Sequence, residues 1–372
     1  MKPTLVHVIG ARPNFVKMAP VVTALERTGA FEQRIVHTGQ HYDARMSDDI
    51  LADLNFPPAD HFLGVGSGNH GEQTAKVLAG FEEILLDRRP DAVMVAGDVN
   101  STLACALAAT KLGIPVAHLE AGLRSGDWSM PEEVNRVLTD RISDVLLTHS
   151  PEALDNLCRE GIDPERVHYV GNTMIDSLRR CEQRARTRAL HRSLGLREHD
   201  YALVTFHRPS NVDDPLRLAQ ISAEICDLAA RHAVVFPIHP RTRARLVETG
   251  AMAGLEAAGV LCIEPVGYLD FLSLQAFAGA ILTDSGGVQE EAAALGVACF
   301  TFRPNTERPV TLSHGTNTLL GEDPAAIRQV GLSRWEPTPC AIPLWDGRAA
   351  ERVADVLIAR FAYSTEPVEV AA

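Results

Sequence analysis

Short apolar runs recur along the chain, and each ends in a glycine or a polar residue. In the first part of the chain these runs predict strands at residues 5–9, 34–38, 92–96, 116–119, 145–148 and 167–170. Stretches with helical periodicity, such as 74–86 and 101–112, lie between them. Strands that alternate with helices indicate a parallel sheet with helices on both faces.

The same alternation starts again after an arginine-rich helical stretch. Its predicted strands lie at residues 201–206, 233–238, 260–263, 279–283 and 298–302. We therefore predict an α/β fold with two Rossmann-like domains, at residues 1–172 and 173–347, and expect the last helix, about 348–361, to pack back on the first domain. Polar residues follow the strands at their carboxyl ends, where open α/β sheets bind ligands. We therefore expect the two domains to face a ligand-binding cleft.

The composition narrows the class of protein. Hydrophobic residues make up 46% and charged residues 22%, as in globular proteins, and no apolar run is long enough to span a membrane. The run at residues 5–9 is too short for a signal peptide, so we expect a cytoplasmic protein. A net charge of -13 argues against nucleic acid or an anionic membrane as partner. The seven cysteines form no C-x-x-C pair, which predicts buried thiols and no metal site.

A strand, a glycine turn and a helix follow one another near residue 285. Ser285 is a suitable N-cap, and Gly286 and Gly287 let a ligand approach the backbone closely. Because the N–H groups at a helix start carry partial positive charge, a phosphate is the expected occupant. Glu290 or Glu291, one turn further on, is suited to accept the hydroxyl groups of a ribose. The alternative is an ordinary capped helix whose first acidic residues complement the helix dipole.

Acidic side chains end two of the apolar strands. Asp98 and Glu120 have this position, where we expect burial to raise the carboxyl pKa and suit the group to proton transfer. Glu132 and Arg136 lie four residues apart in a helix that begins at about Pro131, and therefore on one face. The alternative for this pair is an ordinary surface ion pair worth about 0.3–0.5 kcal/mol.

Basic residues and histidines also follow strands. Arg12 stands at the end of the first strand and Lys17 one helical turn later, a pair suited to two phosphate oxygens or, alternatively, a solvated surface pair. His207 and His239 each follow a strand of the second half, where a histidine is either a site residue or a structural one. No H-x-x-x-H or D-x-D spacing at these histidines supports metal binding.

Several short motifs of this chain occur together in one enzyme family. They are Gly10-Ala11-Arg12-Pro13 with Lys17, Gly97-Asp98, Glu120-Ala121-Gly122-Leu123-Arg124, Pro131-Glu132-Glu133 with Asn135-Arg136, His207-Arg208, Asp284-Ser285-Gly286-Gly287-Val288-Gln289-Glu290-Glu291 and Thr306-Glu307-Arg308-Pro309. In this combination and order the chain resembles the non-hydrolysing UDP-N-acetylglucosamine 2-epimerases. The resemblance implies a fold of the glycosyltransferase-B type, a homodimer, and UDP in the cleft, and we expect no cofactor.

The resemblance also implies roles for single residues. Those that bind or lie near the nucleotide are Arg12, Lys17, His207, Ser285, Gly286, Gly287, Glu291 and Arg308, to which we add His239. Those around the sugar are Asp98, Glu120, Glu132 and Arg136.

The family's reaction, epimerisation at C2 of the sugar, fits these residue types. The C2 proton is not next to a carbonyl group, and the chain has no nicotinamide fingerprint for transient oxidation. Elimination remains: UDP leaves C1 as C2 loses its proton, which gives a 2-acetamidoglucal, and UDP adds back after a proton arrives on the opposite face. We expect Asp98, Glu120 and Glu132 to share the proton transfers, and Arg12, His207 and Arg308 to support UDP, with His207 counted as catalytic.

Local departures from the family pattern concern regulation and substrate. Segments 40–46 and 207–211 differ from the bacterial enzymes that a second substrate molecule activates, which argues against such activation. Val266 stands near the position of a glutamine that lies by the nucleotide in many members. These forms are similar to those of archaeal members and of relatives that act on UDP-2,3-diacetamido uronic acids.

Four alternatives therefore accompany the epimerase hypothesis. The first is the same chemistry on UDP-2,3-diacetamido-2,3-dideoxy-glucuronic acid, and the second is a hydrolysing epimerase that releases N-acetylmannosamine and UDP. The third is a glycosyltransferase on the same fold, and the fourth a binding module without turnover. The cluster of acidic residues argues against the last two, because neither function requires it.

Overall fold

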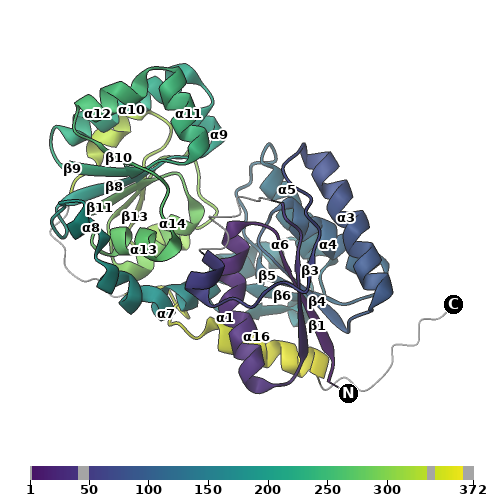
Figure 1. The fold of residues 1–372 in the computed structure, drawn as a ribbon. Coiled ribbons are helices and arrows are strands. Elements are labelled where there is room, and N and C mark those ends of the chain that lie inside the picture. Colours follow the sequence, from purple (N-terminus) through teal and green to yellow (C-terminus); the bar gives the residue numbers. More distant parts are fainter. Residues whose placement is uncertain (1, 41–49, 333–339, 363–372) are drawn as a thin grey trace. The chain divides into compact units, whose positions relative to one another are not determined.

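The computed structural model describes residues 2–40, 50–332 and 340–362 of the 372-residue chain. The chain forms two compact units (Figure 1). Unit 1 comprises Met1–Ser177 and Pro343–Ala372, and unit 2 comprises Leu178–Ile342. The chain thus passes between the units near residues 177 and 343, where the sequence predicted residues 172 and 347.

Within the described residues, unit 1 contains a seven-stranded sheet in the order β3-β2-β1-β4-β5-β6-β7. All neighbouring pairs are parallel. The strands are β1 (Thr4–Ile9), β2 (Glu32–His37), β3 (His61–Phe62), β4 (Ala92–Ala96), β5 (Val116–Ala121), β6 (Val145–Thr148) and β7 (Val167–Tyr169). The two-residue β3 has no apolar run of its own, so the hydrophobic pattern missed it.

Helices connect these strands and bury their apolar faces. They are α1 (Arg12–Thr28), α3 (His70–Asp87), α4 (Asn100–Lys111), α5 (Pro131–Ile142) and α6 (Pro151–Arg159). Helix α7 (Thr173–Arg188) carries the chain from unit 1 into unit 2, and α16 (Ala349–Leu357) belongs to the C-terminal segment of unit 1. Helix α3 buries Gln73, Val77, Phe81 and Leu85, which recur every four residues and so form one stripe. Helix α16 of the C-terminal segment packs against α1.

Unit 2 repeats this architecture. Among the described residues its sheet has six parallel strands in the order β10-β9-β8-β11-β12-β13. The strands are β8 (Tyr201–Thr205), β9 (Ala233–Pro237), β10 (Leu261–Ile263), β11 (Ala280–Thr283), β12 (Cys299–Thr301) and β13 (Asn317–Leu319). The sequence pattern missed the short β13, as it missed β3.

Helices also connect the strands of unit 2. They are α8 (Leu190–Ser193), α9 (Pro209–Val212), α10 (Pro215–Ala229), α11 (Pro240–Glu248), α12 (Ala251–Ala257), α13 (Tyr268–Ala276), α14 (Gly286–Leu295) and α15 (Val310–Ser313). In both units the central strands are buried, because helices cover both faces of the sheet. The prediction of an α/β fold with two Rossmann-like domains is confirmed.

None of the helices in the described part of the chain is long and apolar enough to cross a membrane.

Candidate active site

Glu120 has a backbone conformation that is unusual for its residue type. Its φ angle is +69°, and the pairing of β5 with β6 shifts register between Leu119 and Ala121. A non-glycine residue in this left-handed region is strained, and such residues cluster at functional sites. The sequence predicted that the strand would end before Glu120. In the structure the strand continues through a bulge, which re-aims the glutamate.

The carboxylate of Glu120 forms an ion pair with the ammonium group of Lys17. Each of these side chains is 7% exposed. The pair joins strand β5 to the second turn of helix α1. Glu120 is therefore buried, as the sequence analysis expected, and it faces a cation, which the sequence analysis did not expect.

Gly97 lies against this ion pair. Its φ angle is +67°, and a Cβ atom at this position would stand 2.9 Å from Nζ of Lys17 and 3.3 Å from Oε2 of Glu120. Its N–H group donates to the carbonyl of Leu119, 3.0 Å away. Both the conformation and the close packing require glycine here.

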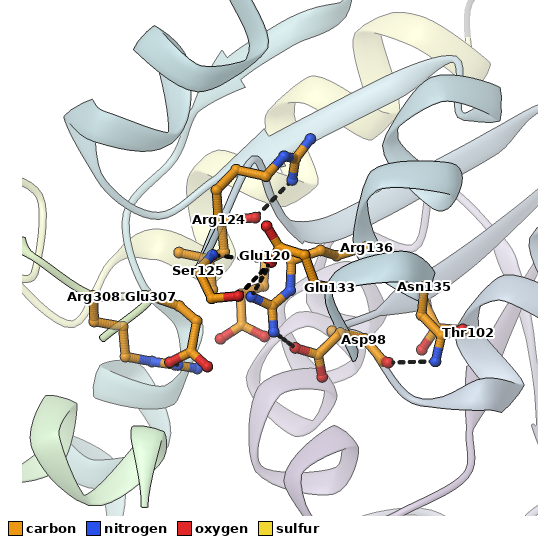
Figure 2. Close-up of polar contacts among 12 residues, drawn as sticks. Asp98, Thr102, Glu120, Arg124, Ser125, Glu133, Asn135, Arg136, Glu307 and Arg308 are labelled. Carbon is orange, nitrogen blue, oxygen red and sulfur yellow. Dashed lines mark hydrogen bonds and ion pairs between the residues drawn. The ribbon is translucent and has the colours of Figure 1, made fainter. Parts of the chain in front are cut away.

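Arg136 binds two carboxylates in unit 1 (Figure 2). Its side chain is 3% exposed and lies 2.5 Å from Asp98 and 2.9 Å from Glu133. The side chain of Asn135 donates to the backbone carbonyl of Asp98, 2.9 Å away. Asp98, which follows β4, is therefore held from both its side chain and its backbone by helix α5.

The ion pair predicted between Glu132 and Arg136 is made by Glu133 instead. Glu132 is exposed in the first turn of α5, whereas Glu133 is buried. Glu133 also accepts hydrogen bonds from the backbone N–H groups of Ser125 and Gly126, both 2.9 Å away. Sequence reasoning missed Glu133, because helical spacing allows an arginine to reach either the third or the fourth residue before it.

A second group that sequence reasoning missed lies behind Glu120. His118 and Asp140 are both fully buried, and Nδ1 of His118 is 2.7 Å from Asp140. Arg124 lies 2.8 Å from the other carboxylate oxygen. Burial alone would raise the pKa of Asp140, but the hydrogen bond with His118 and the charge of Arg124 hold it below the ordinary value. A histidine inside an apolar strand was the available signal.

In unit 2, Asp284 follows strand β11 and accepts several hydrogen bonds. It is fully buried and accepts the backbone N–H groups of His207 and Arg208, at 3.1 and 2.9 Å, and the side chain of Asn211 at 3.1 Å. Nδ1 of His207 lies 2.8 Å from it. Burial raises the pKa of Asp284, but the contacts with His207 and these N–H groups lower it overall. Asp284 thus orients the His207 ring, whose side chain is 49% exposed.

Helix α14 begins at the predicted glycine turn. Ser285 occupies the N-cap position, but its hydroxyl makes no capping hydrogen bond to the described residues. A Cβ atom on Gly286 would stand 2.4 Å from the guanidinium group of Arg308. The glycine therefore lets Arg308 lie directly against the start of the helix.

Buried carboxylates hold Arg308 in place. Nε of Arg308 lies 2.9 Å from Glu290, and another nitrogen lies 3.4 Å from Glu307. Glu307 in turn accepts two hydrogen bonds from Arg303, at 2.7 and 2.8 Å. Burial raises the pKa of Glu307, but Arg303 and Arg308 outweigh it and hold that pKa far below the ordinary value.

Glu290 and Glu291, which the sequence treated together, have different surroundings. Glu291 accepts a hydrogen bond from the side-chain amide of Gln275, 2.6 Å away, whereas Glu290 pairs with Arg308. Burial raises the pKa of Glu291 to about 7, against the opposing effect of that hydrogen bond. Glu291 therefore carries a proton for part of the time at neutral pH.

His239 and Arg12, two further predicted site residues, lie at the starts of helices. His239 is exposed at the N-cap of α11, where Nδ1 accepts the N–H group of Arg241 at 3.3 Å. In this contact His239 has a structural role. Arg12 opens helix α1, but its side chain is not among those the structure describes. Residues 41–46, in the segment that differs from the activated bacterial enzymes, also lie outside the described residues.

Each of the two Rossmann-like units has a parallel sheet with acidic and basic side chains at the carboxyl ends of its strands, and this architecture is of the glycosyltransferase-B type. The family model for UDP-N-acetylglucosamine 2-epimerase matches residues 23–358. The chain belongs to this family.

Known relatives agree with this assignment. The chain is 44% identical over 358 residues to UDP-N-acetylglucosamine 2-epimerase of Methanocaldococcus jannaschii, which covers 94% of this chain and 97% of the relative. The crystal structure of the M. jannaschii enzyme in complex with UDP-GlcNAc and UDP matches with a TM-score of 0.88, 42% identity and coverage of 96% and 99%. UDP-2,3-diacetamido-2,3-dideoxy-D-glucuronate 2-epimerase of Pseudomonas aeruginosa is 42% identical over 321 residues, with coverage of 85% and 88%.

Proposed function

We propose that this protein is an epimerase that interconverts UDP-N-acetylglucosamine and UDP-N-acetylmannosamine by elimination and re-addition of UDP. Family membership supports the reaction, and the ion pair of Glu120 with Lys17 is the single observation on this chain that carries it. A strained backbone that aims a carboxylate at a fixed cation is the kind of pre-organisation that proton transfer requires.

Unit 1 supplies the proton-transfer groups in this proposal. Asp98, Glu120 and Glu132 exchange protons with C2 and the departing oxygen, and Arg136 fixes Asp98. Asp98 is supported by its contact with Arg136, and Glu120 by its contact with Lys17. Glu132 has the exposure that a substrate-facing acid needs.

Unit 2 supplies the nucleotide groups. The N–H groups of Gly286 and Gly287 at the start of α14 suit a diphosphate, beside Ser285 and the guanidinium group of Arg308. Glu291 accepts the ribose hydroxyls. His207, oriented by Asp284, stabilises the departing UDP, and Arg12, Lys17 and His239 add contacts to the nucleotide. No cofactor is required, because elimination needs neither oxidation nor a metal.

The deuteration of C2 tests this proposal. Proton NMR of the purified protein with UDP-N-acetylglucosamine in D2O should show C2 deuteration and the manno epimer, with little free UDP. A Glu120→Gln variant should lose the exchange by about 100-fold or more. Wild-type exchange in that variant would remove Glu120 from the scheme, and free UDP in step with turnover would move the protein to the hydrolysing branch.

A second substrate is favoured by one specific observation. The Pseudomonas aeruginosa relative named for UDP-2,3-diacetamido-2,3-dideoxy-D-glucuronate is about as similar to this chain as the M. jannaschii enzyme. The same NMR experiment with that sugar nucleotide compares the two. Exchange with the uronic acid alone would assign the second substrate and leave the chemistry unchanged.

We infer that the enzyme acts as a homodimer. Leu86 at the end of α3 and Leu138 on α5 are 67% and 46% exposed, and self-association would cover such apolar side chains. Light scattering after size-exclusion chromatography should give twice the mass of one chain. A single-chain mass at micromolar concentration would contradict this.

We also infer a cytoplasmic location. All seven cysteines lie among the described residues, and none of them forms a disulfide bond, as expected in a reducing compartment. Fractionation of cells that express the protein at its native level should recover it with cytoplasmic enzymes.

A further inference from the structure

Asp140 forms hydrogen bonds on both sides of Glu120. One carboxylate oxygen lies 2.7 Å from Nδ1 of His118, and the other accepts the backbone N–H group of Gly122 at 3.0 Å. His118 and Gly122 stand two residues before and two residues after Glu120 on the same chain segment. We propose that Asp140 is a positioning residue that holds Glu120 in its strained conformation, an inference that rests on the proposed role of Glu120.

The strained backbone of Glu120 needs additional contacts to hold it in place. A non-glycine residue with a φ angle of +69° is strained and persists only where its surroundings hold it in that conformation. The ladder between β5 and β6 loses its register at this point, so sheet pairing alone does not determine the backbone. A single carboxylate that binds both flanks of the bulge supplies the missing constraint.

The contacts of Asp140 also extend to the end of strand β4, through His118. Nε2 of His118 lies 2.8 Å from the carbonyl oxygen of Gly97, which packs against the Lys17–Glu120 ion pair. Asp140 is thereby connected to the end of β4 as well as to β5. Displacement of its carboxylate would move both Glu120 and the backbone that precedes Asp98.

Asp140 does not act on the substrate itself. Its side chain is fully buried, and its charge is balanced by Arg124, which lies 2.8 Å away and also makes two hydrogen bonds of 2.7 Å to Glu160. The acid is thus saturated with partners of unit 1. A group in this state acts on the reaction only by positioning Glu120.

Asp144 offers a matched control. Its carboxylate accepts the backbone N–H group of Val116 at 2.8 Å, at the opposite end of strand β5 from Glu120. Both aspartates therefore hold β5 through a backbone amide, and only Asp140 does so at the strained residue. Asp144 is exposed and Asp140 is fully buried, so Asp144→Asn controls only for the loss of a carboxylate contact to β5.

The test compares these two variants by C2 deuteration kinetics and by amide hydrogen exchange. Asp140→Asn should lower kcat by about 100-fold, as expected for a displaced catalytic group, with KM within about twofold. It should also increase exchange at the Gly122 amide. Asp144→Asn should leave kcat within about twofold and affect only the Val116 amide. If Asp140→Asn does not fold, His118→Asn removes one of the two contacts and should lower kcat with the same selectivity.

Two results would overturn the inference. An Asp140→Asn variant with wild-type kcat would show that the contacts of Asp140 do not position Glu120 for the reaction. Unchanged protection of the Gly122 amide in Asp140→Asn would show that Asp140 does not hold the backbone after Glu120. If the wild-type protein exchanges C2 of no UDP-sugar, the proposed function fails by itself, and the amide measurement still decides whether Asp140 holds the bulge.

Discussion

Lys17 and Glu120 form a buried ion pair between helix α1 and strand β5, although they are 103 residues apart in the sequence. Two charges removed from water depend on one another, because each loses hydration that the attraction of its partner offsets. This contact therefore links the stability of unit 1 to the chemistry we propose for it.

Variants at this pair should show that dependence. Lys17→Met and Glu120→Gln should each lower the free energy of unfolding by about 3–5 kcal/mol, because each removes the ion-pair partner of a buried charge. The double variant should lose clearly less than the sum of the two. Urea unfolding of the four proteins measures the coupling, and additive losses would contradict it.

Substitution by glutamine should lower mainly stability at Glu133 and mainly C2 exchange at Glu132. Glu133→Gln removes the charge beside Arg136 and weakens the contacts with Ser125 and Gly126, so it should destabilise the protein by about 2 kcal/mol or more. Glu132→Gln should change stability by less than about 0.5 kcal/mol, because Glu132 is exposed. Its C2 exchange should nevertheless fall by about 100-fold or more.

Thermal unfolding and C2 deuteration of both variants separate the two effects. Wild-type exchange in Glu132→Gln would remove Glu132 from the proton transfers. Unchanged stability in Glu133→Gln would show that the Arg136 contact contributes little.

A methyl group at Gly286 should disturb the start of helix α14. Its Cβ would stand 2.4 Å from Arg308, which must then move. We expect Gly286→Ala to weaken UDP binding by about tenfold or more, measured by calorimetry. Gly254 in α12 is the control, because a Cβ there has no neighbour within 4 Å. Gly254→Ala should stabilise the protein by up to about 1 kcal/mol and leave UDP affinity unchanged.

The raised pKa of Glu291 should make stability depend on pH. Burial raises this pKa to about 7 from an ordinary 4.5. Below the ordinary value both states are protonated, and between the two values the unfolded chain loses the proton that the folded protein keeps. Stability therefore falls as pH rises through this window, by about 3 kcal/mol in total.

Glu291→Gln isolates this contribution, since the other carboxyl groups titrate in both proteins. From about pH 4 to about pH 8 the variant should gain stability relative to the wild type. Urea unfolding at the two pH values measures the difference. A constant difference between the proteins would show that the pKa of Glu291 is not raised.

Much of the fold was predictable because its signal is local. Each central strand is buried on both faces and so reads as an apolar run, while the helices between them repeat at their own period. The short strands β3 and β13 escaped this signal, because two or three half-exposed residues carry no pattern. Their positions depend on the strands beside them.

The site was predictable by residue type and less so by contact. Asp98 follows a strand and Ser285 stands at a helix start, as the alternation indicated, while Glu120 lies in the last two residues of its strand. Their partners were not predictable. Helical spacing could not choose between Glu132 and Glu133 for Arg136, and nothing local announced that Asp284 orients His207.

The sequence by itself determined the order of strands and helices, the two Rossmann-like domains and, through its motifs, the family. Only the tertiary structure decided that Glu120 has a left-handed backbone, that Lys17 is its partner, and that Asp140 binds both flanks of the bulge. The physical reason is the range of the interactions. Secondary structure follows from neighbours a few residues apart, whereas a buried charge takes its partner from whichever distant segment the packing brings beside it.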